Sequence, residues 1–155
     1  WPAAIPVFLI MMSFIGACVG SPGGGIKVVR ILVMFRLGMK EINKFIRPNA
    51  QVSVKLNKSS INEKALVSVL GFFSLYAITF FLILMLLMFA GLDQVTAYSA
   101  TAATMNNLGP GLGDVAQNYG SVGEAAKWIL SFSMLIGRLE VLTIIAIFHR
   151  AFWRQ

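Results

Sequence analysis

The chain lacks the residues that usually build metal centres and catalytic clusters. Among 155 residues there is one cysteine, Cys18, and one histidine, His149. A single cysteine excludes a disulfide within the chain. Together the two residues supply neither a zinc ligand set nor a nucleophile with its base. We therefore expect a protein that is not an enzyme.

Charged residues are also scarce, and long uncharged runs take their place. Only 12% of the residues are charged, whereas 57% are hydrophobic. No charge occurs between Lys64 and Asp93, and residues 66–90 exceed the ~20 residues that a helix needs to cross a bilayer. A shorter apolar run, residues 3–19, is at the lower limit for a span, and another begins near Ala125. The composition predicts an all-α integral membrane protein with more than one crossing.

Acidic residues are few and basic residues are unevenly placed. The net charge is +7, and residues 27–64 hold nine of the thirteen lysines and arginines. The positive-inside rule places this segment in the cytoplasm. The loop between the two long apolar runs carries Asp93, Asp114 and Glu124 and is predicted to face outside. A basic segment of this size also suits nucleic acid, but we favour topology determination and lipid headgroups as its role.

The most informative stretch is DQVTAYSATAATMNNLGPGLGD, residues 93–114, which follows the longest apolar run. Its first half is small and hydroxylated and favours a short helix packed against neighbours. Its second half is broken by glycine and proline. Irregular backbone survives at membrane depth only where it is buried in protein or lines water, and its carbonyls can then coordinate a cation. The pattern indicates a pore loop with a carbonyl filter near Asn106–Gly109; an ordinary extracellular turn is the alternative.

Residues 20–27, GSPGGGIK, form a second glycine-rich break, after the first apolar run. The segment approaches a phosphate-binding loop, but Ile26 and Lys27 replace the expected Lys-Ser/Thr pair and no strand precedes it. We therefore do not expect nucleotide binding. One interpretation is a helix interrupted within the membrane, whose loop occupies a permeation path. The other is a plain linker at the membrane interface.

Other local patterns complete the expected organisation. Residues 26–40 are amphipathic and basic, which suits a helix at the cytoplasmic interface. Residues 51–60 alternate and predict a short strand or an extended linker. Ser60 and Glu63 have the spacing of a capping box that opens the long helix. The final helix is expected from about residue 124 to 148, with Trp128 and Trp153 as interfacial anchors.

Two charges interrupt the final apolar run, Arg138 and Glu140. At about 100° per residue, positions two apart point about 200° from each other, so these side chains cannot pair along one helix face. A charge inside the membrane requires a partner or a water-filled path. We therefore expect one of them to face a pore and the other a packed neighbour.

Taken together, these motifs resemble a known family. AATMNNLGPGLGD, AKWIL and GRLEVLTIIAIF are similar to the fourth repeat of the TrkH family, in the Trk/Ktr/HKT superfamily of potassium transporters, and FIGACVGSPGGGIKVVR resembles the interrupted inner helix of its third repeat. The resemblance implies four helix–pore-loop–helix repeats in a pseudo-fourfold pore. Residues 1–40 would then be the second half of the third repeat, 41–64 a cytoplasmic linker and 65–155 the fourth repeat.

The same resemblance implies roles for individual residues. The potassium ion would be held by carbonyls at the filter, with Asn107 and Leu108 as its principal ligands; the filter residues are Asn106, Asn107, Leu108 and Gly109. The gate would comprise the intramembrane loop together with a basic residue of the final helix; its residues are Gly20, Ser21, Pro22, Gly23, Gly24, Gly25, Lys27 and Arg138. Glu140 would be a structural charge.

The resemblance also implies the setting of the protein. Its members sit in the bacterial inner membrane as multi-pass proteins, form homodimers and dock a cytoplasmic nucleotide-binding ring similar to TrkA. The partners expected are therefore the remaining pore repeats of the same chain, a second copy, that ring and the lipid bilayer, and no nucleic acid. A secondary transporter with a broken-helix substrate site and an apolar scaffold subunit without a transport role are the competing functions. Channel and coupled symport both remain open.

Overall fold

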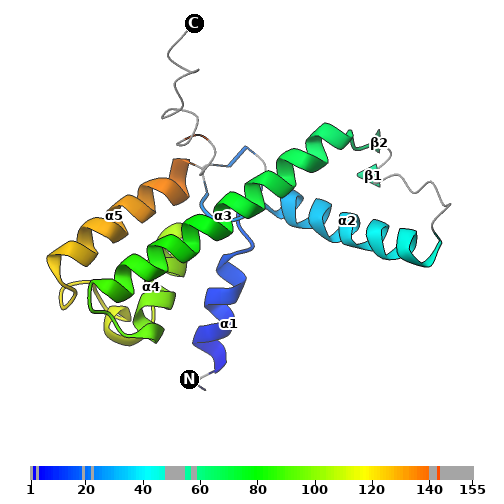
Figure 1. Cartoon of the computed structure of the whole chain (residues 1–155). Coiled ribbons are helices and arrows are strands. Elements are labelled where there is room, and N and C mark those ends of the chain that lie inside the picture. Colours follow the sequence, from blue (N-terminus) through cyan, green and yellow to red (C-terminus); the bar gives the residue numbers. More distant parts are fainter. Residues whose placement is uncertain are drawn as a thin grey trace, which may run out of the picture.

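The computed structural model describes residues 2, 4–18, 20–21, 23–47, 55–56, 59–139 and 143. Almost all of them belong to helices or to the turns between helices (Figure 1). The elements in chain order are α1 (Ala4–Ser13), α2 (Val28–Ile46), β1 (Lys55–Leu56), β2 (Ser59–Ser60), α3 (Glu63–Phe89), α4 (Gln94–Met105), the 3-10 helix η1 (Gly113–Val115) and α5 (Glu124–Leu139). The mostly helical fold agrees with the expected all-α class.

The long apolar run forms α3, the one described helix that is both long and apolar enough to cross a membrane. Its 27 residues correspond to about 40 Å of helix. The helix begins where the side chain of Asn62 accepts a hydrogen bond from the backbone N–H of Lys64 at 3.2 Å. The expected capping box is therefore wrong: Ser60 belongs to β2, and Asn62 is the N-cap because it directly precedes the first helical residue.

The first apolar run is not one continuous helix. Helix α1 contains only 10 residues and ends at Ser13, where the side-chain hydroxyl donates to the carbonyl of Ile10 at 2.6 Å. Within residues 3–19, regular α-helix is therefore described only as far as Ser13. The break in the helix begins directly after Ser13, before the expected loop at residues 20–27. Regular helix resumes at Val28.

Helix α2 leads away from α1, α4 and α5 (Figure 1). One face packs on the start of α3, where Val33 and Leu66 are buried together. The other leaves large side chains such as Phe35 and Phe45 exposed. The helix ends at Ile46. Of the two alternatives for residues 51–60, a strand or an extended linker, the structure shows short paired strands, β1 and β2.

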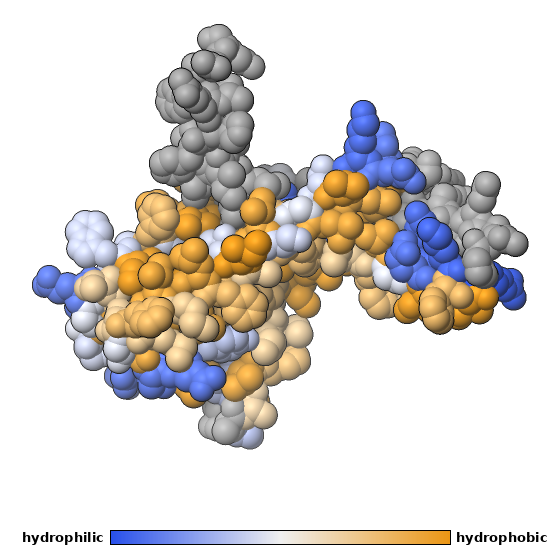
Figure 2. All heavy atoms as spheres, viewed as in Figure 1, coloured by the Kyte–Doolittle hydropathy of each residue, from blue (hydrophilic) through white to orange (hydrophobic). Residues whose placement is uncertain are grey.

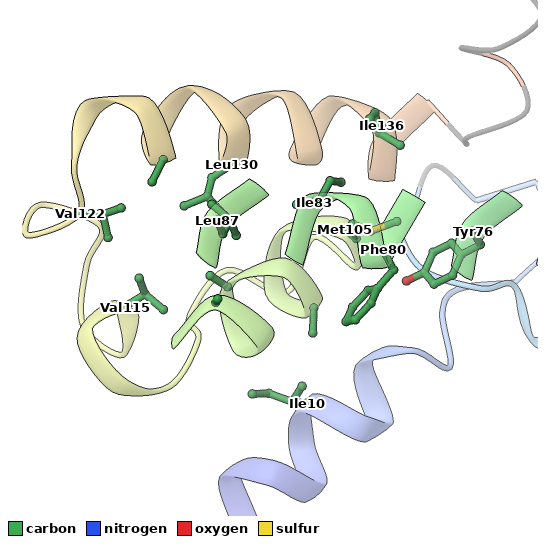
Figure 3. Packing of buried hydrophobic residues seen from close by; sticks show 14 of the residues in the cluster. Ile10, Tyr76, Phe80, Ile83, Leu87, Met105, Val115, Val122, Leu130 and Ile136 are labelled. Carbon is green, nitrogen blue, oxygen red and sulfur yellow. The ribbon is translucent and has the colours of Figure 1, made fainter. Parts of the chain in front are cut away.

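Helix α4 is the centre of the fold. It contacts α1, α3 and α5, and its small residues Ala97, Ala100, Ala102 and Ala103 are fully buried. Small side chains allow neighbouring backbones to approach closely. The surrounding cluster, which includes Leu87, Met105, Leu130 and Ile136, fills the space between these helices (Figure 3).

The outer surface of this bundle is apolar. Large hydrophobic side chains of α3 are exposed along its length, and Figure 2 shows the corresponding surface as largely hydrophobic. Trp128, near the start of α5, is 79% exposed. A surface of this kind suits lipid or further helices, because exposed apolar patches of such extent are unusual on soluble monomers.

Candidate functional site at the carboxyl end of helix α4

The backbone leaves helical geometry directly after Met105. Asn106 is the C-cap of α4, and Asn107 adopts a left-handed conformation with φ 54°. Gly109 follows with φ 106°, a region that residues with a side chain rarely adopt. Asn106 is buried, whereas Asn107, Leu108 and Gly109 are exposed. The predicted break is therefore an irregular segment that leads from the buried end of a helix to an open face.

In this segment the backbone N–H groups form hydrogen bonds, whereas most of the carbonyl oxygens do not accept one from any described residue. The backbone N–H groups of Asn106, Asn107 and Leu108 donate to carbonyls of α4 over 3.0, 3.1 and 2.8 Å. Across the described parts of the chain, no hydrogen bond ends on the carbonyl oxygens of these three residues. The carboxyl end of a helix also carries a partial negative charge. The segment is therefore electrostatically suited to a cation.

The carbonyl of Gly109 differs from its neighbours. It accepts a hydrogen bond from the hydroxyl of Tyr119 at 2.7 Å. A carbonyl oxygen has a second lone pair, so this bond orients the group without using all of its acceptor capacity. Further along, the hydroxyl of Ser99 donates to the carbonyl of Leu112 at 3.1 Å and fixes the return of the chain.

The side chain of Asn106 faces the protein and not the open side. Its Oδ1 accepts a hydrogen bond from the hydroxyl of Tyr76 at 2.6 Å, and its Nδ2 donates to the hydroxyl of Ser13 at 2.9 Å. Tyr76 and Asn106 are both buried. The expected role of Asn106 therefore concerns its main-chain carbonyl alone.

The glycine-rich break between α1 and α2 forms a loop that is closed at its base. The backbone N–H of Ile26 donates to the carbonyl of Phe14 at 3.1 Å, and that of Gly16 donates to the carbonyl of Ile26 at 2.8 Å. Within the loop, Gly20 and Gly25 have φ of 84° and 79°, which explains the need for glycine at both positions. Ser21, Gly23 and Gly24 are partly buried and Lys27 is the N-cap of α2, whereas Pro22 lies outside the described residues.

This loop packs directly against the start of the irregular segment. A Cβ atom on Gly24 would lie 2.7 Å from both the carbonyl oxygen of Asn106 and the Nδ2 of Asn107. A Cβ on Gly25 would lie 3.4 Å from the Oδ1 of Asn106. Contacts below 3.0 Å are not tolerated without displacement, so Gly24 must be a glycine in this arrangement. Two motifs more than 80 residues apart in the sequence thus meet at Asn106.

Helix α5 closes the site from a third side. A Cβ atom on Gly137 would overlap the carbonyl oxygen of Met105 and lie 2.9 Å from the Nδ2 of Asn107. Arg138 is the next residue and is exposed. Among the acidic residues that the structure describes, none forms an ion pair with Arg138; Glu140 is not among them. Of the expected gate residues, Gly24 and Gly25 therefore lie against the start of the expected filter, and Gly137, the neighbour of Arg138, packs there from α5.

Several residues at the site were not predicted from the sequence. Tyr76 had a usable signal, because a lone tyrosine in a spanning run needs a buried partner for its hydroxyl. Gly137 had a weaker one, since a glycine inside a helical pattern often marks close packing. Ser13 and Tyr119 had none, because each acts through a contact with a residue distant in the sequence.

Two groups outside the spanning segments have shifted pKa values. A hydrogen bond with the side chain of Thr96, followed by bonds from backbone N–H groups, lowers the pKa of the Asp93 carboxyl, which caps α4. The ionised carboxylate of Asp93 therefore stabilises the folded chain at pH values above the ordinary carboxyl pKa. This stabilisation is lost as the pH falls through the lowered pKa. Burial raises the pKa of Tyr119, which keeps its hydroxyl protonated as the donor to Gly109. Neither group titrates between about pH 5 and 8.

Comparison with known proteins gives a consistent result. The sequence model of the TrkH family, described as "Cation transport protein", matches residues 1–154. The chain is 47% identical over 155 residues to the Trk system potassium uptake protein TrkH of Halomonas elongata, and 46% identical to that of Escherichia coli strain K12; in each case it covers all of this chain and 32% of the relative.

A solved structure agrees with the sequence comparison. The crystal structure of the potassium transporter TrkH from Vibrio parahaemolyticus superposes with a TM-score of 0.91 at 45% identity, over 99% of this chain and 33% of that one. The chain thus spans about a third of the length of the proteins that it matches.

Proposed function

The chain belongs to the TrkH family of cation transport proteins, and on that premise we propose that it supplies one pore-loop repeat and half of another to a potassium pathway across the bacterial inner membrane. Helix α3, helix α4, residues 106–113 and helix α5 would form the helix–pore-loop–helix repeat. Helix α1, the loop and helix α2 would form the interrupted half-repeat. The open face of residues 107–110 would then line the pore, opposite repeats that this chain does not contain.

One observation carries this proposal. The N–H groups of Asn106, Asn107 and Leu108 are bonded to α4, whereas their carbonyl oxygens accept no hydrogen bond within the described residues. Oxygen acceptors replace the hydration shell of a cation, and potassium filters are built from rings of such carbonyls. A site for an anion would require the reverse arrangement, with free N–H groups or a helix amino end.

The competing function is a secondary transporter in which the break between α1 and α2 holds a substrate. Ion flux through the full-length protein in planar bilayers separates the two. We expect a passive current whose reversal potential follows the potassium gradient. Transport that requires a second solute, with no passive current, would favour the transporter.

Substitution of Gly109 by serine is expected to lower selectivity for potassium over sodium. No atom lies within 4 Å of an added Cβ, so space is not limiting, but φ of 106° is strained for any residue with a side chain. Such strain costs about 1–3 kcal/mol, and the backbone relieves it by rotating the carbonyls of Leu108 and Gly109. The measurement is the permeability ratio from bi-ionic reversal potentials.

Gly123→Ser is the matched control for this prediction. Gly123 lies in the same outer loop, also has open space around its Cβ position, and does not have a left-handed φ. Its substitution is expected to leave the ratio unchanged. An unchanged ratio in folded Gly109→Ser would remove Gly109 from the filter.

The loop against Asn106 is proposed to be a gate. Deletion of residues 21–24 removes the Gly24 contact and leaves the bonds among Phe14, Gly16 and Ile26 that close the loop. Basal potassium flux is then expected to rise while selectivity is retained, as measured by rubidium uptake into proteoliposomes. An inserted, folded variant with equal or lower flux would show that the loop is structural.

The remaining assignments follow from the family. The full-length protein is proposed to form a homodimer and to bind a cytoplasmic nucleotide-binding ring. The basic residues of α2 and the linker after it provide an inner surface for that ring and for anionic lipid. No catalytic role is proposed for any residue.

A further inference from the structure

Tyr76 holds an unusual position in the spanning helix. It is the one tyrosine of α3, and its hydroxyl points back into the buried cluster (Figure 3). There it donates to the Oδ1 of Asn106 over 2.6 Å, with both residues at least nine-tenths buried. A buried acceptor that loses its only strong donor is left without water to replace it. The bond therefore fixes the orientation of the Asn106 side chain.

The opposite end of Asn106 is held by a different element. Its Nδ2 donates to the hydroxyl of Ser13 over 2.9 Å, and that hydroxyl donates in turn to the carbonyl of Ile10 over 2.6 Å. Ser13 is the last residue of α1 and leads into the glycine-rich loop. One asparagine side chain thus links the spanning helix, the end of α4 and the start of the loop.

Asn106 is also the residue that the loop touches. A Cβ atom on Gly24 would lie 2.7 Å from its carbonyl oxygen, and one on Gly25 would lie 3.4 Å from its Oδ1. The same residue begins the row of carbonyls that accept no hydrogen bond within the described chain. Its side chain and its carbonyl share one Cα, so loss of the side-chain bonds would leave the residue free to shift and its carbonyl free to turn.

We propose that Tyr76 is a positioning residue for ion selectivity, and that the hydrogen-bonded chain Tyr76–Asn106–Ser13 holds the inner end of the filter in register with the loop. This inference rests on the proposed function, because it takes residues 106–109 as the filter. Tyr76 does not touch the ion; it sets the direction of the Asn106 carbonyl from a helix that spans the membrane.

The test is the Tyr76→Phe variant of the full-length protein in planar bilayers. The ring and its contacts with Phe14 and Phe72 are retained, and only the hydroxyl is lost. The potassium-to-sodium permeability ratio is expected to fall by about three- to tenfold, the equivalent of one hydrogen bond. Because the buried Oδ1 of Asn106 loses its donor, thermal stability in detergent is expected to fall as well. Protein yield and stability are therefore measured beside the ratio, and the ratio is compared only for folded, inserted protein.

Tyr98→Phe is the matched control. Tyr98 lies on α4, and among the described residues its hydroxyl makes one long contact, 3.9 Å, with the sulfur of Met11. The same chemical change there is expected to leave the ratio unchanged. Equal ratios in wild type and Tyr76→Phe would overturn the positioning role while leaving the proposed function intact. A wild type that does not distinguish potassium from sodium would overturn the proposed function itself.

A double-mutant cycle tests the chain as a unit. Ser13→Ala removes the bond at the other end of Asn106 and is expected to lower the ratio in the same direction. If the two bonds act through one side chain, the double variant Tyr76→Phe/Ser13→Ala will be little worse than the poorer single variant. Fully additive losses would show that the residues act separately and would contradict the chain.

Discussion

Substitution of Gly137 by alanine is expected to lower potassium transport by at least about tenfold. The added methyl group would overlap the carbonyl oxygen of Met105 and lie 2.8 Å from its carbonyl carbon. Met105 is fully buried at the end of α4, which is packed among α1, α3 and α5. Either α5 or the end of α4 must move, and the filter proposed here begins at that end.

The matched control is Gly71→Ala in α3. Gly71 is also a helix glycine, but no atom lies within 4 Å of its Cβ position. Alanine there is expected to preserve transport and to add about 0.5–1 kcal/mol of helix stability. Rubidium uptake per amount of inserted protein compares the two variants. Normal uptake in Gly137→Ala would mean that the contact between α5 and α4 does not support the pathway.

Replacement of Arg138 by alanine is expected to increase conductance. A fixed positive charge about 4 Å from a cation repels it by about 4 kcal/mol at an effective dielectric constant of about 20. Arg138 is exposed, follows the residue that touches the filter end, and has no acidic partner among the described residues. We therefore interpret it as a barrier beneath the filter, which single-channel recording of the full-length variant tests.

The alternative is that Arg138 has a structural role and forms an ion pair with an acidic residue of another repeat. That role predicts misfolding or lost flux in Arg138→Ala. Glu140→Gln is the control, because the sequence predicts Glu140 to be a structural charge under either interpretation; Glu140 itself lies outside the described residues. It is expected to lower yield without raising conductance. A well-folded Arg138→Ala protein with reduced flux would refute the barrier.

Local sequence signals were sufficient to predict the central helices, α3 and α4. The uncharged run predicts α3, and the small, hydroxylated residues from Thr96 to Thr104 predict a short packed helix, which the structure confirms as α4. The break after Met105 was predicted because Asn, Gly and Pro in succession cannot continue a helix. These features depend on a few neighbouring residues, so they are visible without knowledge of the fold.

The errors and omissions have one physical cause. Hydrophobicity predicts that residues 3–19 are an apolar run at the lower limit for a span, but it does not show where the helix ends. Gly16 approaches the backbone of Gly24 and Ile26, and for this the chain turns after Ser13. The bond from Tyr76 to Asn106 and the contact of Gly137 with Met105 join residues about 30 apart. Such contacts depend on how the helices pack against one another, which the local sequence does not show.

The roles of the filter and gate residues, and the domain boundaries, stay predictions.

The central claim is that the carbonyls of Asn106, Asn107 and Leu108 hold a potassium ion. Anomalous diffraction from crystals of the full-length protein grown with rubidium or thallium in place of potassium tests it most directly. The account predicts an anomalous peak within coordination distance of these carbonyl oxygens, on the open side of the segment. A transport-competent protein whose peaks all lie elsewhere, for example at the break between α1 and α2, would contradict it.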